Sequence, residues 1–279
     1  MAEPSNASAS KGKARAVPSR SSTPGVKTVV IIPDVQLPFH DRRATQRVID
    51  FIGASQPDEV VQIGDLLDLP QPSRWTKGTR GEFEGSVQKD AEQTKRQFLD
   101  PLRKVYDGPV GAHEGNHDER ARVYLEKYAP ALAESNAFDM DVLLDFDGFG
   151  VELLPEFYDI APGWLSTHGH RGGIRLSQIS GSTALNAAKK FGKSVVCGHT
   201  HRLGLSHFSS GYAGRSVVDV SGMEVGNLMD MKKAQYLKGG SANWKQGFGM
   251  LHIDGNVVKP EIIPITKGAF IAGGETWRI

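Results

Sequence analysis

Five separated segments of this chain share one pattern: a short apolar, β-branched run that ends in an Asp, Asn or His beside a glycine or a turn. Such runs are typical of buried strands. The ends of strands in α/β proteins are natural ligand sites, so the pattern predicts that these polar side chains converge. They are Asp34 after 28–32, Asp65 after 59–63, Asn116 after 109–112, His168 after 164–167, and His199 with His201 after 194–197.

Helical patterns alternate with the first strands, at about 43–52 and 86–106, which indicates an α/β domain. A later helix is expected over 176–191, and further strands over 142–146 and 151–154. The rest of the chain reads mostly as β with Gly-rich turns. Since no internal repeat or linker is apparent, we expect one domain over residues 27–279.

Residues 1–26 differ from the rest of the chain. They are rich in Ser, Ala and Pro, and they carry four Lys or Arg residues against a single Glu. No hydrophobic period is present, so the segment cannot bury enough surface to offset the entropy of ordering. We therefore expect a disordered basic tail before the folded domain.

Composition excludes several classes of protein. No apolar run reaches the roughly 18 to 20 residues that cross a bilayer, and the N-terminus lacks the apolar core of a signal peptide, so we expect a cytoplasmic protein without membrane contact. The net charge of +1 gives no support for nucleic-acid binding, which remains an open alternative. The single cysteine, Cys197, rules out an internal disulfide and a cysteine-based zinc site. Any metal must use His, Asp and Asn.

Taken singly, these polar residues have ordinary explanations. Asp34 alone is more typical of a helix or turn cap, and the segment Gly115-Asn116-His117-Asp118 could be a turn whose Asp118 caps the next helix. Gly198-His199-Thr200-His201 is different, because two histidines at i and i+2 after a buried strand suit chelation better than packing.

The order of the motifs carries more information than any one of them. It runs Asp34, Gly-Asp65-x-x-Asp68, Gly-Asn116-His117-Asp118, His168 and Gly-His199-x-His201. Over residues 28–202 this order resembles the calcineurin-like metallophosphoesterase family. The resemblance implies a four-layer αββα sandwich, with two mixed β-sheets packed face to face and helices outside.

The resemblance also implies a pair of divalent cations. Asp65 would bridge both ions, Asp34 and His201 would complete the first site, and Asn116, His168 and His199 would complete the second. Manganese is the expected metal, with Fe, Zn, Ni or Mg as alternatives, because oxygen and imidazole ligands suit all of them to differing degrees.

One position departs from the family pattern. The first motif is usually Asp-x-His, whereas this chain has Asp34-Val35-Gln36. The Gln36 carbonyl oxygen can serve a hard cation, but it is a poorer ligand than imidazole, so the first site is expected to be weaker or to prefer Mg or Mn.

Several residues are candidates for acting on substrate. By the resemblance, His117 would donate a proton or hydrogen bond to the leaving oxygen, and Asp118 would orient its ring unless it caps the next helix. Other candidate substrate contacts are Asn116, His170, Arg74, Arg120 and Arg202, each of which could equally be an ordinary loop or rim residue.

The implied function is hydrolysis of phosphodiester or phosphomonoester bonds by a metal-activated hydroxide. Small substrates are expected, nucleotides or cyclic nucleotides above all, because no large added domain is evident. The alternatives are a metal-dependent nuclease and a catalytically weak metal-binding scaffold. Walker, dinucleotide-fold and serine-elbow motifs are absent from the sequence, so a kinase, a dehydrogenase or a serine hydrolase has no support.

Overall fold

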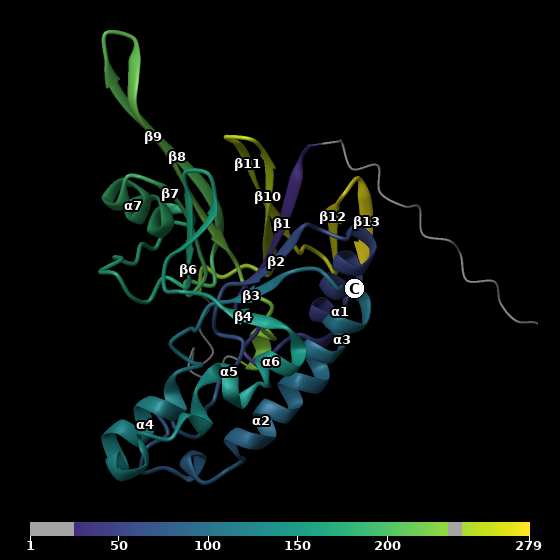
Figure 1. The fold of residues 1–279 in the computed structure, drawn as a ribbon, viewed down its shortest axis with the longest axis vertical. Helices are drawn as coiled ribbons and strands as arrows, with labels where there is room; N and C mark the ends of the chain where they lie inside the picture. The colour runs from purple at the N-terminus through teal and green to yellow at the C-terminus, as the bar shows by residue number, and fades with distance from the viewer. Residues whose placement is uncertain (1–24, 234–241) are drawn as a thin grey trace, which may run out of the picture.

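The computed structural model describes residues 25–233 and 242–279, so the predicted basic tail lies almost entirely outside the described residues. Two β-sheets lie side by side with helices on their outer faces (Figure 1). The helices are α1 (Arg42–Ser55), α2 (Val87–Thr94), α3 (Asp100–Val105), α4 (Arg120–Tyr128), α5 (Met140–Leu143), α6 (Phe146–Phe149) and α7 (Ser182–Phe191). Short 3-10 turns lie at Arg80–Glu82, Pro130–Leu132, Asn136–Phe138 and Met231–Lys233.

The first sheet has six strands in the order β11-β10-β1-β2-β3-β4. Strands β1 to β4 run parallel, β10 pairs antiparallel with β1, and β11 pairs antiparallel with β10 at the edge. Its strands are β1 (Lys27–Ile32), β2 (Glu59–Gln62), β3 (Val110–Ala112), β4 (Val151–Leu153), β10 (Gly247–Asp254) and β11 (Val257–Pro264).

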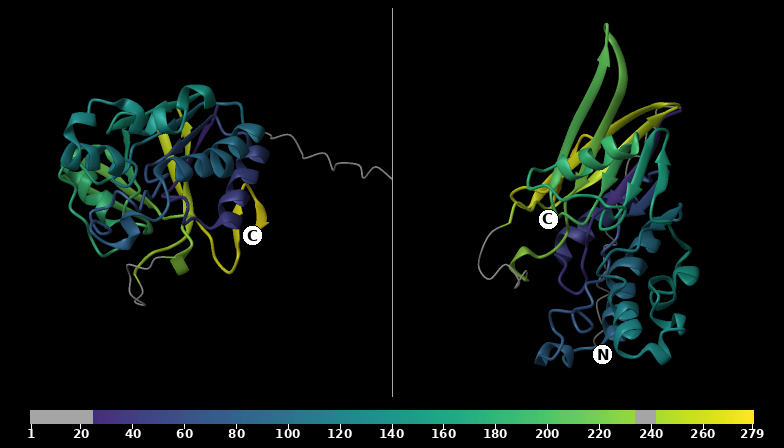
Figure 2. Two further views of the ribbon diagram at one scale, coloured as in Figure 1. Left: turned by 90° about the horizontal axis from the view of Figure 1, so that it is seen from below. Right: turned by 90° about the vertical axis from the view of Figure 1, so that its left-hand side faces the viewer.

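The second sheet has five strands in the order β5-β6-β7-β9-β8. Here β6, β7 and β9 are parallel, whereas β5 and β8 are antiparallel. The β8–β9 hairpin extends well beyond the body of the molecule (Figures 1 and 2). The strands are β5 (Tyr158–Ala161), β6 (Trp164–Thr167), β7 (Ser194–Cys197), β8 (Leu203–Tyr212) and β9 (Arg215–Val225), with a separate hairpin of β12 (Ala269–Ala272) and β13 (Glu275–Arg278).

Three hydrophobic clusters define four layers. In β1, Val30 and Ile32 face the cluster formed with α1, α2 and α3, whereas Val29 and Ile31 face the cluster between the sheets. This alternation follows from the two-residue period of a strand. A third cluster packs α7 on the outer face of the second sheet, against Cys197 and its neighbours. The αββα sandwich implied by the resemblance is therefore confirmed.

The predicted strand over 142–146 is wrong, because the chain forms the short helices α5 and α6 there. Met140, Leu143 and Phe146 are buried at intervals of three residues, which is a helical spacing. The predicted helix 86–106 is present, with a π-helical segment at Lys95–Leu99. The helix expected over 176–191 begins only at Ser182.

No helix within residues 25–233 and 242–279 combines the length and the apolar character needed to span a bilayer.

Glu224 of β9 is a buried carboxylate that fixes the start of α7. One of its oxygens accepts a hydrogen bond from the Gly181 backbone N–H at 2.5 Å, and Thr183 also donates to this side chain. Burial raises the pKa of Glu224, and these hydrogen bonds partly offset the rise.

We expect Glu224→Ala to lower the free energy of unfolding by about 1 to 3 kcal/mol, because buried donors lose their acceptor. Urea unfolding measures this change; Glu224→Gln, which keeps one acceptor oxygen, should lose less, and equal stability of all three proteins would contradict the role.

Candidate metal centre

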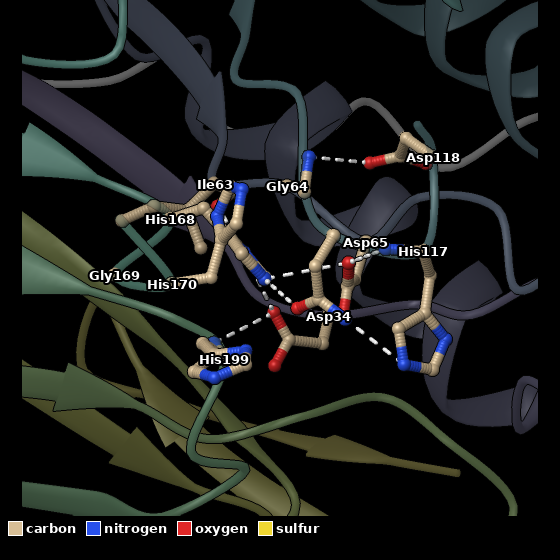
Figure 3. Close-up of polar contacts among 12 residues, drawn as sticks. Asp34, Ile63, Gly64, Asp65, His117, Asp118, His168, Gly169, His170 and His199 are labelled. Carbon is tan, nitrogen blue, oxygen red and sulfur yellow. Dashed lines mark hydrogen bonds and ion pairs between the residues drawn. The ribbon is translucent and has the colours of Figure 1, made fainter. Parts of the chain in front are cut away.

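The five strand ends predicted from the sequence meet in the structure. Two groups of side chains have ligand atoms that all lie within 4.8 Å of one another. The first group is Asp34, Asp65 and His201, and the second is Asp65, His168 and His199. Asp65 belongs to both groups, and Asp34 and Asp65 lie between His117 on one side and His168 with His199 on the other (Figure 3). The two sheets therefore contribute jointly to one cluster.

The loops that carry these side chains approach one another closely. A Cβ added at Gly115 would stand 2.2 Å from the Asp65 backbone nitrogen, so only glycine permits the loop after β3 to approach Asp65 this closely. Asp65, His199 and His201 adopt left-handed backbone conformations, with φ of 53°, 63° and 56°. Strain of this kind in non-glycine residues concentrates at functional sites.

His168 is held in a defined orientation. Its Nδ1 lies 3.0 Å from the Ile63 carbonyl oxygen and donates to it, which directs Nε2 into the cluster. There Nε2 lies 3.3 Å from Asn116 Oδ1 and 3.3 Å from Asp65 Oδ1. A histidine whose other nitrogen is bound to a carbonyl is the usual arrangement around a metal. Asn116 is thus brought beside the second ligand group.

Burial shapes the charges of this cluster. Burial raises the pKa of Asp34 to about 8, and Asp65 adds to the rise. Burial would also raise the pKa of Asp65, but two neighbouring histidines outweigh it and hold this pKa well below its usual range. Burial would lower the pKa of His168, yet Asp65 raises it to about 10. Burial lowers the pKa of His199 to about 4 and that of His201 to about 3, which keeps these rings neutral and ready to bind a cation.

The donor set fits divalent metal ions. Among the described residues, Asp34 Oδ2, Gln36 Oε1 and His201 Nδ1 are buried without a hydrogen-bond partner. Buried polar atoms are normally satisfied, so such exceptions call for a missing partner. The carboxylates of Asp34 and Asp65, with the nearby imidazoles, supply the oxygen and nitrogen ligands that such ions prefer. A cation would also displace the protons held by Asp34 and His168.

Gln36 lies at the first ligand group. Its Nε2 is 3.2 Å from His201 Nε2 and 3.4 Å from Asp65 Oδ2. Rotation of the Gln36 amide group by half a turn exchanges its nitrogen and oxygen. Oε1, which has no hydrogen-bond partner, would then lie where Nε2 lies now.

Because of this position, we expect Gln36→His to raise the affinity of the first site by roughly tenfold or more, the scale on which single changes near a metal act. Titration of the apoprotein with Mn²⁺ or Zn²⁺ against a chelator measures the change. Gln36→Ala is the matched control and should bind more weakly than the parent; identical titration curves for all three proteins would show that Gln36 is no ligand.

His117 lies beside the cluster, and its two ring nitrogens contact a carboxylate and an arginine. Its Nδ1 donates to Asp68 Oδ1 at 2.6 Å, and its Nε2 lies 2.9 Å from Arg120 Nη2. Since arginine only donates, Nε2 accepts in this arrangement. Arg120 also donates to the Asp68 backbone oxygen. Asp68 is the last residue of the Gly-Asp-x-x-Asp motif, and this spacing is the one sequence signal that singles it out.

Asp118 has neither of the two roles that we expected, which were orienting His117 and capping the next helix. Its carboxylate accepts hydrogen bonds from the backbone N–H of Leu67 at 2.7 Å and of Gly115 at 2.8 Å. Burial, with Asp65 nearby, raises the pKa of Asp118 to about 8. The carboxylate on the His117 ring is that of Asp68, so the expectation that Asp118 orients this ring is wrong. Nor does its side chain cap α4, which begins after Glu119. Asp118 instead ties the loop after β2 to the loop after β3.

The remaining candidate substrate residues lie at different places. The His170 ring lies 5.2 Å from that of His168, and both His170 nitrogens are buried without a hydrogen-bond partner in the described part of the chain. Arg202 follows His201 and donates to Gln178 Oε1 at 3.0 Å. Arg74 is exposed, and its described contact is with the ring of Trp75 at 4.6 Å. The structure thus brings His170 to the cluster, whereas Arg74 lies on the loop that follows Asp68.

Two mixed sheets with a carboxylate and histidine cluster at their shared edge define a metal-binding αββα sandwich protein. The family model of the calcineurin-like phosphoesterases matches residues 27–203, and the chain belongs to that family. The resemblance predicted from the motif order is confirmed.

Similar proteins occur in bacterial viruses. The chain is 59% identical over 254 residues to the Gene 54 protein of Mycobacterium phage L5, and equally to that of Mycobacterium phage D29, covering 91% of this chain and 99% of each relative. Among solved structures it is similar to Vps29 from Cryptosporidium parvum, at 15% identity and a TM-score of 0.45 over 90% of this chain and 94% of that one. Vps29 complexed with Zn²⁺ from Entamoeba histolytica matches at 13% identity and a TM-score of 0.44, over 90% of this chain and 98% of that one.

Proposed function

We propose that this protein is a binuclear metal-dependent phosphoesterase that hydrolyses small phosphoesters, with nucleotides or cyclic nucleotides as the substrate class. The observation that carries the proposal is the pair of ligand groups that share Asp65. A carboxylate can offer one oxygen to each of two cations, and the flanking residues then divide between them. Asp34, His201 and Gln36 would hold one ion, and His168, His199 and Asn116 the other.

Paired divalent ions, when bound, would supply a hydroxide at neutral pH and offset phosphoryl charge. Manganese suits the mixture of carboxylate, amide and imidazole donors. The unpartnered Asp34 oxygen and the neutral rings of His199 and His201 support this assignment.

The residues beside the ligands supply proton transfer and anion binding. Asp68 fixes the His117 ring through Nδ1, so that Nε2 is the atom left to act on a leaving oxygen. Arg120 occupies Nε2 in this arrangement, and its positive charge is available to a phosphoryl oxygen. We expect substrate to draw Arg120 from Nε2, so that this nitrogen can take up a proton from solvent and pass it to the leaving oxygen.

A substrate panel tests the proposal. Bis-p-nitrophenyl phosphate, p-nitrophenyl phosphate, 2′,3′-cyclic nucleotides and single-stranded DNA are each incubated with the protein in Mn²⁺ and in EDTA. We expect hydrolysis of the small esters in Mn²⁺ and its loss in EDTA. Cleavage of DNA alone would favour a nuclease, and metal binding without hydrolysis of any substrate would favour a scaffold.

A further inference from the structure

Trp244 lies directly against a residue of the metal centre. The centroids of the Trp244 and His201 rings are 4.5 Å apart, and their planes are tilted by 53°. His201 belongs to the ligand group with Asp34 and Asp65. Trp244 is partly buried. An aromatic surface therefore borders the first ligand group.

The backbone around Trp244 is tied to the site, which fixes the indole relative to His201. The Lys245 N–H donates to the His201 carbonyl at 3.0 Å. Asn227, which is fully buried, donates from its side-chain amide to the same carbonyl at 3.2 Å. The Asn227 backbone N–H in turn donates to the Lys245 carbonyl. A surface held this firmly loses little conformational entropy when it binds a ligand.

A second connection joins the segment that carries Trp244 to Gln178. Asn243, its neighbour, donates to the Gln178 carbonyl at 3.0 Å. The Gln178 side chain accepts from Arg202, which follows His201. Arg202 Nε is buried without a hydrogen-bond partner among the described residues. The segment that carries Trp244 and the Arg202 side chain are therefore joined through Gln178.

Cations held by the two ligand groups would attract the phosphoryl group, which every phosphoester carries, so selection among esters must come from residues around those groups. A partly exposed indole favours planar aromatic groups, because stacking stabilises them and offers less to an aliphatic chain. We infer that Trp244 is the residue that selects esters bearing a nucleobase, by stacking on the base while the phosphate lies at the ligand groups. This inference rests on the proposed function and names the feature of the substrate that the site selects.

Trp75 is an alternative candidate for stacking on a nucleobase. Its side chain is 75% exposed, and Arg74 lies over its ring. Its described contacts, however, stay within the loop that follows Asp68, such as the hydrogen bond of its backbone N–H to Ser73 Oγ. Trp244 instead contacts a ligand of the metal centre. The two tryptophans can be separated by experiment.

The test compares two phosphates that differ only in the base. AMP and ribose 5-phosphate are titrated calorimetrically into the Mn²⁺-loaded parent, Trp244→Ala, Trp244→Phe and Trp75→Ala. We expect the parent to bind AMP about tenfold or more tightly than ribose 5-phosphate, as stacking of one base allows. Trp244→Ala should bring this ratio to about 1, Trp244→Phe should keep most of it, and ribose 5-phosphate affinity should stay the same.

Several outcomes would overturn the inference. One is equal binding of AMP and ribose 5-phosphate by the parent. Another is a loss of the preference in Trp75→Ala together with its retention in Trp244→Ala. A third is an equal weakening of both ligands in Trp244→Ala with reduced Mn²⁺ affinity, which would make Trp244 only a support for His201. Thermal melting of each variant identifies misfolding, and Trp244→Phe then decides the question.

The inference and the proposed function can fail separately. If the parent prefers AMP but hydrolyses none of the panel substrates, the phosphoesterase proposal fails and base stacking by Trp244 stands. If the parent hydrolyses the panel substrates but shows no base preference, only the assignment of Trp244 fails.

Discussion

Asp65→Asn is expected to lower kcat/KM for bis-p-nitrophenyl phosphate by about 1000-fold, near the upper end for loss of one preorganised electrostatic group. The substitution keeps the shape of the side chain but removes the charge common to both ligand groups. Asp65 also stabilises the positive charge of His168 and accepts the His117 backbone N–H at 2.9 Å. The centre should therefore bind metal more weakly, and metal analysis after dialysis should show less bound Mn²⁺ than in the parent.

Asp159→Asn is the matched control, because Asp159 is an exposed carboxylate of β5 paired with Lys193 at 2.6 Å. It should retain the metal content and the activity of the parent. Full metal content in Asp65→Asn, or a rate within a few-fold of the parent, would show that Asp65 is not shared between two ions.

His117→Ala is expected to give the second-largest loss, roughly 100- to 10,000-fold in kcat, the range for removal of a general acid or base. The loss should be greatest for esters with poor leaving groups, such as alkyl phosphates. It should be smallest for p-nitrophenyl esters, whose leaving oxygen needs little protonation. Bound Mn²⁺ should stay at the parent level, because neither ligand group includes His117. Rate measurements over a series of leaving groups provide the readout.

His207→Ala serves as the control, since His207 lies on β8 and its ring pairs with Ser221 Oγ at 2.8 Å. Its rates should match those of the parent for every ester. If His117→Ala lost activity equally for good and poor leaving groups, proton donation by this ring would be refuted, and a role in binding the phosphoryl group would remain.

Much of the fold followed from local patterns. The continuous apolar run 28–32 predicted a buried strand, and in the structure Val29 and Val30 belong to different core clusters. The segment 142–146 was misread because a short apolar run satisfies the strand and helix periods equally. Only packing of Met140, Leu143 and Phe146 against the first sheet's helical layer decided for a helix.

Parts of the site could not be read from the chain. Asp68 and Asp118 are both carboxylates of the predicted motifs, and nothing local says which one reaches His117. The loop after β2 turns Asp68 toward the ring, whereas the loop after β3 turns Asp118 toward two backbone N–H groups. Trp244 was missed altogether, because its segment meets His201 through hydrogen bonds between remote parts of the backbone.

By itself the sequence determined the strand ends, the chemical types of the candidate metal ligands and the family. The period of a strand and the order of motifs can both be read directly from the order of residues along the chain. The tertiary structure decided which carboxylate serves His117 and which aromatic ring borders His201. These choices depend on loop conformations and on the approach of two sheets. Such contacts join residues far apart in the chain, and no local period encodes them.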